Sequence, residues 1–186
     1  VPHATLRVFY NFNYGELDTY EPSVTAIKPD IRELAQRVRY IKAMAPKLKD
    51  LGVEHVGSIS RDRIKQELNQ AECLAYSCDT VTWSEGFSIS TLEACNHKVV
   101  PIITACDALG EVYENVAEVI PMPIGKHLEL FTQKVIQSLV DKDYRESITE
   151  RARCFAKQHD WSVIAEEYEK VIINQILREL KKTDYE

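Results

Sequence analysis

The chain has 186 residues, of which 45% are hydrophobic and 28% charged, and its formal net charge is −6. This size and composition are typical of one ordinary globular domain, so we expect residues 1–186 to form a single domain. The acidic balance and the lack of a Lys/Arg stripe exclude a general nucleic-acid binder. A membrane span is also excluded, since no apolar run approaches the roughly 20 residues that it needs.

The cysteines and histidines do not form the patterns of a metal site or a disulfide framework. None of the five cysteines belongs to a C-x-x-C pair, and no two of the five histidines are spaced H-x-x-x-H. Four cysteines lie in or beside apolar segments and are predicted to be buried, reduced thiols. Val1-Pro2-His3 carries neither a basic flank nor a small-residue cleavage site. No signal peptide is therefore predicted, and the expected location is the cytoplasm.

Two short strands flank one helix in the first third of the chain. Residues 5–12 are rich in β-branched and aromatic side chains and are predicted to form a strand that ends in a long polar loop. Apolar residues then recur at three- and four-residue steps, which predicts an amphipathic helix from near Asp30 that Pro46 kinks or splits. Gly52 ends this pattern, and residues 53–57 are predicted to form the second strand.

The next stretch continues the alternation of helix and strand. Ser60 is the predicted N-cap of a helix, and the apolar run Cys73–Tyr76 follows as a strand. Residues 85–93 supply another helix, and two more strands are predicted over 99–103 and 117–120. Such alternation is typical of α/β proteins, so we predict a Rossmann-like parallel sheet with helices on both faces.

The carboxyl edge of this sheet is the expected ligand side, because open α/β sheets bind ligands outside the carboxyl ends of their strands. The loops expected to converge there follow Phe12, Gly57, Tyr76 and Ile103.

The last third, residues 124–186, is predicted to be a helical tail of the same domain. Asp160 is the expected N-cap of the final helix. From Trp161 to Leu180 the apolar positions of this helix span about five turns, which is more than a short sheet needs to cover. Part of the helix is therefore expected to pack on another domain.

The segment Ser84–Ala94 sets Glu85 and Glu93 around a glycine and several hydroxyl residues, directly after a buried strand. A helix that begins near Ser88 offers free amides and a positive dipole end to an anion such as phosphate. A continuous helix between the two glutamates separates them by about 12 Å, roughly the span from a sugar to a ribose across a diphosphate. The alternative is an acidic first turn that only stabilises a surface helix. For Trp83 and Phe87, an anchoring role in the core or loop competes with sugar stacking.

The succession of motifs resembles a known family. Gly52-Val53-Glu54-His55-Val56-Gly57, then the strand at Cys73, then Glu85-Gly86-Phe87 through Leu92-Glu93-Ala94, then Val99-Val100-Pro101 is similar to the C-terminal, donor-binding domain of a GT-B-fold retaining glycosyltransferase. More narrowly, the chain resembles glycosyltransferase group 1 (family 4), whose hallmark is Glu-x7-Glu within E-G-F-G-x-x-x-L-E-A. Asp160-Trp161-Ser162 before a long helix also resembles the family's ending.

The resemblance implies roles for particular residues of this chain. Glu85, the candidate catalytic residue, accepts hydrogen bonds from hydroxyls of the donor sugar, and Glu93 accepts from the ribose. The backbone of Gly86, Phe87, Ser88 and Ile89 lies against the sugar and diphosphate, and Gly57, Ser58 and Ile59 contact the base. The expected substrates are a UDP-, GDP- or ADP-linked sugar and a carbohydrate or lipid-linked acceptor, with no metal and no other cofactor.

Two departures from the family pattern affect this expectation. Ser88 replaces a glycine, which narrows the close backbone approach and either alters the sugar accepted or signals decay of the site. The family also opens this domain with a strand followed by an Arg and a Lys that neutralise the diphosphate, and no such segment precedes Leu6. The chain is therefore expected to begin one β-α unit late, to lack the N-terminal acceptor-binding domain and to be inactive alone.

Two other functions remain open at this point. One is a catalytically inactive Rossmann-like interaction or regulatory module, which the missing basic pair and Ser88 favour. The other is a second enzyme on the same architecture, such as a nucleotide-sugar epimerase, which needs acid/base carboxylates near the sugar and a complete partner domain.

Overall fold

The structure is a computed structural model that describes residues 3–9, 29–78 and 85–183. Clustering of the backbone divides the chain into two compact units. The first unit is Val1–Glu67 with Val81–Trp83, and the second is Leu68–Thr80 with Ser84–Glu186. That the two units act as one nucleotide-sugar-binding domain stays a prediction.

The first unit contains two short parallel strands joined through a helix. Strand β1 (Leu6–Val8) pairs with β2 (Val53–His55), and helix α2 (Pro29–Asp50) lies between them in sequence. Gly52 makes the turn from α2 to β2 with φ of 85°, a conformation that glycine adopts without steric cost. Of the predicted strand over 5–12, residues 10–12 lie outside the described residues. The prediction that Pro46 splits the helix is wrong, because α2 continues through it for its last turn.

The helix that follows β2 is α3 (Arg61–Leu68), and it begins as predicted. The Ser60 hydroxyl accepts a hydrogen bond from the Arg63 N–H at 3.3 Å, and the Ser60 carbonyl accepts one from the Ile64 N–H at 3.0 Å. Ser60 therefore accepts the first regular bond of the helix through its carbonyl, and its hydroxyl satisfies one of the amides that a helix leaves without an internal partner.

The second unit is built on a three-stranded parallel sheet of order β3-β4-β5. Its strands are β3 (Cys73–Tyr76), β4 (Val100–Thr104) and β5 (Glu118–Ile120). The central strand β4 is buried along its whole length, as expected of a strand covered on both faces. The described strands thus form two small parallel sheets, one in each unit, where the sequence pattern had predicted one.

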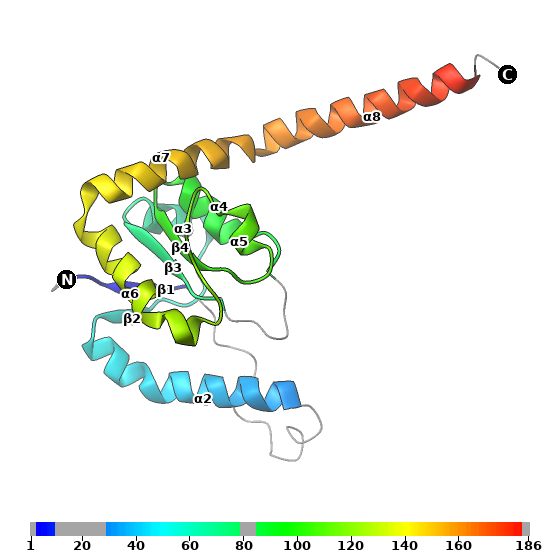
Figure 1. The fold of residues 1–186 in the computed structure, drawn as a ribbon. Coiled ribbons are helices and arrows are strands. Elements are labelled where there is room, and N and C mark those ends of the chain that lie inside the picture. The colour runs from blue at the N-terminus through cyan, green and yellow to red at the C-terminus, as the bar shows by residue number, and fades with distance from the viewer. Residues whose placement is uncertain (1–2, 10–28, 79–84, 184–186) are drawn as a thin grey trace. The chain divides into compact units, whose positions relative to one another are not determined.

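Helices cover both faces of the β3-β4-β5 sheet, as predicted, because successive side chains of β4 point to opposite sides. Ile103 packs in a cluster with residues of α4 (Ile89–Asn96) and α5 (Leu109–Val112). Val100 and Ile102 pack instead with residues of α6 (Ile124–Val140). Figure 1 shows α4 and α5 on one side of the sheet and α6 on the other.

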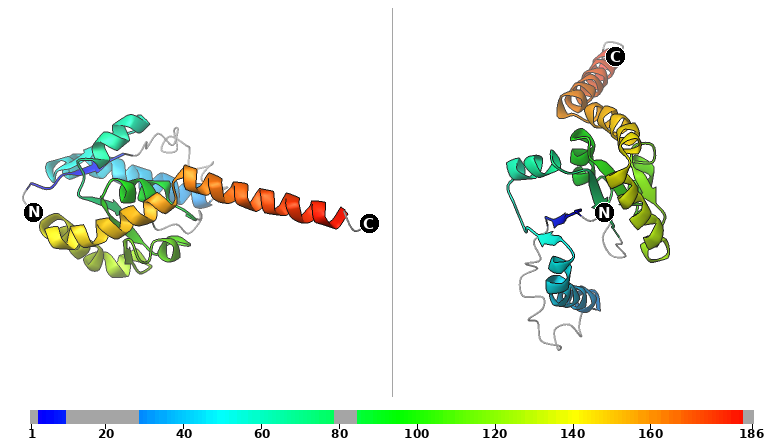
Figure 2. Two further views of the ribbon diagram at one scale, coloured as in Figure 1. Left: turned by 90° about the horizontal axis from the view of Figure 1, so that it is seen from above. Right: turned by 90° about the vertical axis from the view of Figure 1, so that its left-hand side faces the viewer.

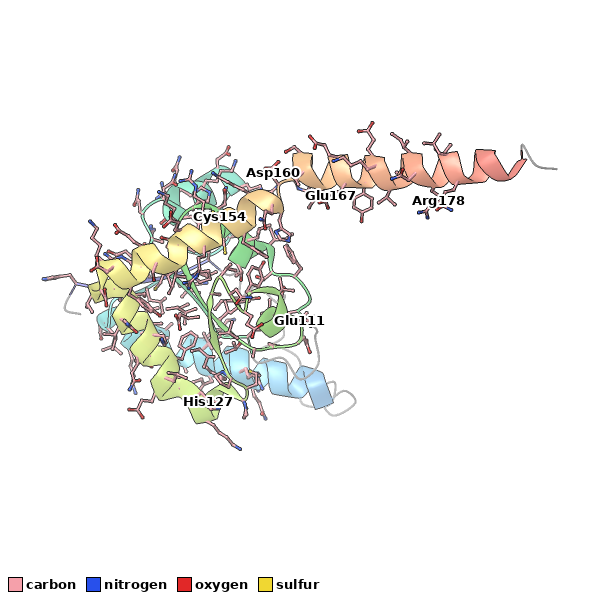
Figure 3. All side chains as sticks on the ribbon, turned by 45° about the horizontal axis from the view of Figure 1, so that its top comes forward. Glu111, His127, Cys154, Asp160, Glu167 and Arg178 are labelled. Atoms are coloured by element: carbon pink, nitrogen blue, oxygen red, sulfur yellow. The ribbon has the colours of Figure 1, made fainter. Side chains whose placement is uncertain are left out.

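The helical C-terminal end consists of α6, α7 (Lys142–Gln158) and α8 (Trp161–Thr183). Helix α7 packs in both clusters. Its Ile148 lies in the cluster of Val100 and Ile102, and its Ala152 lies in the cluster of Ile103. Asp160 lies at the junction of α7 and α8 (Figure 3), and its carboxylate accepts the Ser162 N–H at 2.9 Å, which confirms the predicted N-cap. Beyond this junction, α8 extends away from the β3-β4-β5 sheet in both Figure 1 and Figure 2.

Candidate functional site

The Glu85–Ser88 segment leads into helix α4 at the carboxyl end of the second unit's sheet. Ser88 is the N-cap of α4, and its hydroxyl accepts the Thr91 N–H at 3.2 Å. The helix thus begins at Ile89, close to the predicted start near Ser88. Glu85 precedes the helix, so the 12 Å estimate for a continuous helix between Glu85 and Glu93 does not apply. The cause is the N-cap itself, because a capping residue has extended, non-helical backbone angles.

Ser88 has a structural role in this chain. Its φ of −76° lies outside the left-handed region, so the backbone does not require glycine at this position. The residue is buried, its hydroxyl caps α4, and its carbonyl accepts the Tyr113 hydroxyl at 2.9 Å. Ser88 therefore provides a helix cap through its side chain, which glycine at this position could not do.

Glu85 is held from two sides. Its carboxylate oxygen Oε2 accepts a hydrogen bond from the Tyr76 hydroxyl at 3.0 Å. Its backbone N–H donates to Oδ2 of Asp107 at 3.1 Å. Burial, followed by the hydrogen bond to Glu85 and the charge of its carboxylate, raises the pKa of the Tyr76 phenol, so this hydroxyl remains a donor at neutral pH.

Phe87 anchors the segment to the helices around it. Its ring is tilted against that of Tyr113, at 5.9 Å between centroids, and against the His159 imidazole at 5.7 Å. His159 in turn packs on Phe155 of α7 at 4.1 Å. These contacts agree with the predicted anchoring role for Phe87, although 41% of its surface remains exposed. Trp83 lies outside the described residues.

Gly86 and Ile89 border open space. A Cβ added to Gly86 meets no heavy atom of the described residues within 4 Å, and the φ of Gly86 lies outside the left-handed region. The folded chain therefore does not require glycine here, and the position leaves room for a ligand to approach the backbone. The amides of Ile89 and Ser90 have no acceptor among the described residues, as is usual for the first turn of a helix.

Glu93 is half-buried on α4, one turn after Ile89. Glu85, Glu93 and residues 86–89 all belong to the second compact unit, so the fold keeps the two predicted carboxylates and the segment between them together. Gly57, Ser58 and Ile59 lie in the first unit, where Gly57 adopts φ of 80°. Convergence of this turn with the Glu85–Glu93 segment stays a prediction.

The structure adds residues that the sequence reasoning did not single out. Tyr76 ends β3 and Asp107 follows β4, and both positions were detectable in principle because they lie at the predicted ligand edge of the sheet. Tyr113 and His159 had no such signal. Their contacts with the site depend on how α5 and α7 pack, which short sequence patterns do not encode.

The described residues contain neither a metal-binding cluster nor a membrane-spanning helix. No group of three or more His, Cys, Asp or Glu side chains there is arranged to hold a metal ion. No helix there is long and apolar enough to cross a membrane. The expectation that the donor is bound without a metal stays a prediction.

Comparison with known proteins supports the fold and no single family. No family model matches the chain, and no curated protein matches it. Among solved structures it is similar to sucrose-phosphate synthase from Thermosynechococcus elongatus, with 17% identity and a TM-score of 0.61. The match covers 96% of this chain and 47% of the synthase chain, so the chain spans about half the length of that protein. At this identity the likeness shows the fold alone, an α/β architecture with a helical C-terminal end.

Proposed function

We propose that this chain is the donor-binding half of a retaining glycosyltransferase similar to glycosyltransferase group 1 (family 4). One observation carries the proposal. Glu85 lies before α4 and Glu93 lies on it, at the carboxyl end of a parallel sheet. Between them lie the amides of Ile89 and Ser90, which have no acceptor among the described residues. Two acceptors on either side of an anion site match the hydroxyls and diphosphate of a nucleotide-sugar.

Each predicted residue has a role in this proposal. Glu85 binds hydroxyls of the donor sugar, Glu93 binds the ribose, and the α4 amides face the diphosphate. The turn Gly57–Ile59 contacts the base. In retaining transfer of this type the nucleoside diphosphate is the leaving group. Negative charge develops on it as its bond to the sugar breaks. Helix amides stabilise that charge, so the side chains position the donor and no side-chain nucleophile is required.

The proposal also gives α8 a partner, an acceptor-binding domain or subunit that presents an apolar surface. Seven large apolar or aromatic side chains of α8 are about half to four-fifths exposed: Trp161, Tyr168, Val171, Ile172, Ile173, Ile176 and Leu177. Figure 3 shows the α8 side chains projecting beyond α7. Because the synthase match covers only half of a longer chain, a second domain is the occupant that this proposal selects.

Amide hydrogen exchange tests this partner. Amides of α8 are expected to exchange more slowly in the complete two-domain enzyme than in this chain alone. Concentration-dependent dimerisation of the chain that Ile172→Glu abolishes would instead assign the apolar face of α8 to a second copy.

Thermal shift against UDP-, GDP- and ADP-linked sugars tests the proposed function. One of the three classes is expected to raise the Tm of the chain in a concentration-dependent way, by mass action. If none does so, the inactive interaction module becomes the better interpretation of this chain. In the Gly86→Ala variant this rise in Tm should be smaller, since the added methyl changes the site surface without meeting any atom of the described residues.

A further inference from the structure

We propose that Tyr76 and Asp107 are positioning residues for Glu85, one acting on its side chain and the other on its backbone. The inference rests on the proposed function, in which Glu85 receives the donor sugar. Neither residue belongs to the Glu85–Glu93 motif, and the fold brings both to it from neighbouring strands.

The register of the sheet explains how the two residues meet Glu85. Tyr76, the last residue of β3, pairs with Ile103 of the adjacent strand β4, and Asp107 lies in the turn just after β4. Both therefore stand at the carboxyl edge of the sheet, where Glu85 lies. Asp107 holds φ of 46°, a left-handed conformation that aspartate and asparagine tolerate better than most residues.

One of the two hydrogen bonds fixes the side chain of Glu85, and the other fixes its backbone. The Tyr76 hydroxyl donates to Oε2 of Glu85, which selects one rotamer of an otherwise flexible side chain. The Oε1 atom has no hydrogen-bond partner among the described residues, so it remains available to accept from a sugar hydroxyl. Asp107 accepts the Glu85 N–H, which holds the backbone just before the open surface of Gly86.

A preorganised carboxylate favours the sugar and leaves the nucleotide unaffected, and this difference distinguishes positioning from general support of the fold. Tyr76→Phe keeps the ring and removes only the hydroxyl. By calorimetry, its affinity for the stabilising nucleotide-sugar is expected to fall about three- to tenfold, while its affinity for the matching free nucleoside diphosphate stays within about twofold. Equal losses for both ligands, or no loss for either, would overturn the role of Tyr76.

Asp107 is tested by a pair of variants. Asp107→Asn keeps an acceptor oxygen and tolerates the left-handed backbone, so it should bind the nucleotide-sugar as the parent chain does. Asp107→Gly keeps the backbone conformation but loses the acceptor, so its affinity for the nucleotide-sugar alone should fall. The same loss in both variants would contradict a role through this hydrogen bond. Tyr144→Phe is the control for Tyr76→Phe. It also removes one phenol hydroxyl, but Tyr144 packs against the cluster on the other face of the sheet, so its affinity for the nucleotide-sugar should not change.

A ligand-free measurement separates this inference from the proposed function. If the parent chain binds neither nucleotide-sugars nor free nucleotides, the proposed function fails. The contact between Tyr76 and Glu85 can still be tested without a ligand, by measuring the Tm of Tyr76→Phe, of Glu85→Ala and of the double variant. The Tm losses of the single variants are expected to be non-additive in the double variant, and additive losses would refute the positioning of Glu85 by Tyr76.

Discussion

The two compact units differ in what they bury. In the second unit, Ile102 and Ile103 are completely buried within apolar clusters on both faces of the sheet. Among the described residues of the first unit, the buried side chain is the charged Glu67, which pairs with Arg7 and with Arg63 at 2.9 Å. Apolar burial stabilises a sheet roughly in proportion to the apolar area removed from water. The attraction within a buried ion pair must first offset the large cost of desolvating both charges, so it contributes less to stability.

This difference bears on the candidate site. Glu85 and Glu93, the proposed ligands of the sugar and the ribose, lie on the unit with the apolar core. Gly57–Ile59, the turn predicted to contact the base, lies on the unit where ion pairs link the described elements. We therefore expect the Glu85–Glu93 segment to be more rigid than the Gly57–Ile59 turn, and the following predictions test that contrast.

The largest effect is expected from truncation in the second unit. Ile103→Ala removes a fully buried side chain from β4 and should lower the free energy of unfolding by about 2–5 kcal/mol, measured by urea denaturation. Leu51→Ala is the matched control in the first unit, because that side chain is 78% exposed and its loss should cost less than about 0.5 kcal/mol. Similar losses for the two variants would remove the contrast between the units.

A smaller loss is expected from the charge cluster of the first unit. Glu67→Gln removes the charge that faces Arg7 and Arg63, which are both partly exposed, and should cost roughly 1–3 kcal/mol. The loss should shrink in 0.5 M salt, because mobile ions weaken the pairs that Glu67 makes in the parent chain. Glu54→Gln, at an exposed partner of Arg7, should cost less than about 1 kcal/mol. A loss that is independent of salt would argue against an electrostatic origin.

Gly86→Ala should affect binding without affecting stability. Because an added Cβ meets no atom within 4 Å in the part of the chain that the structure describes, the free energy of unfolding should change by less than about 0.5 kcal/mol. If a donor approaches the backbone there, its affinity should fall about tenfold, or about 1.4 kcal/mol, by calorimetry. Unchanged affinity would place the donor away from Gly86.

The smallest effect is the pH dependence of stability that comes from Cys95 in the second unit, which is absent at neutral pH and develops above pH 9. Burial raises the pKa of the Cys95 thiol from 9.0 to about 12. The unfolded thiol ionises above pH 9 while the folded one stays protonated, so its contribution to stability is complete below pH 9 and is lost between pH 9 and about 12. Cys95→Ala should flatten the decline of the unfolding free energy over that window. An unchanged slope would contradict the burial of this thiol.

Local patterns predicted the parts of the fold that depend on neighbours in sequence. The N-caps Ser60 and Asp160 followed from residue type, and the strand at β3 followed from its apolar run. Periodicity also predicted helices on both faces of the sheet. Of the two outcomes predicted for Pro46, a split helix was wrong, because α2 continues through this residue to Asp50.

The support around Glu85 could not be predicted in the same way. Tyr76 reaches it from nine positions earlier in the chain and Asp107 from 22 positions later, so both contacts depend on the pairing register of β3 and β4. The division of the strands into two small sheets likewise depends on long-range packing. Sequence motifs identified the candidate carboxylates, whereas the structure was needed to show what holds one of them.

Calorimetry of two glutamate variants with a nucleotide-sugar and its free nucleoside diphosphate tests the central claim most directly. Glu93→Gln is expected to weaken binding of both ligands, because the ribose is common to them. Glu85→Gln is expected to leave binding of the free diphosphate unchanged and chiefly to impair transfer by the complete enzyme. Nucleotide affinity that is unchanged in Glu93→Gln would contradict the assignment of this helix as the donor site.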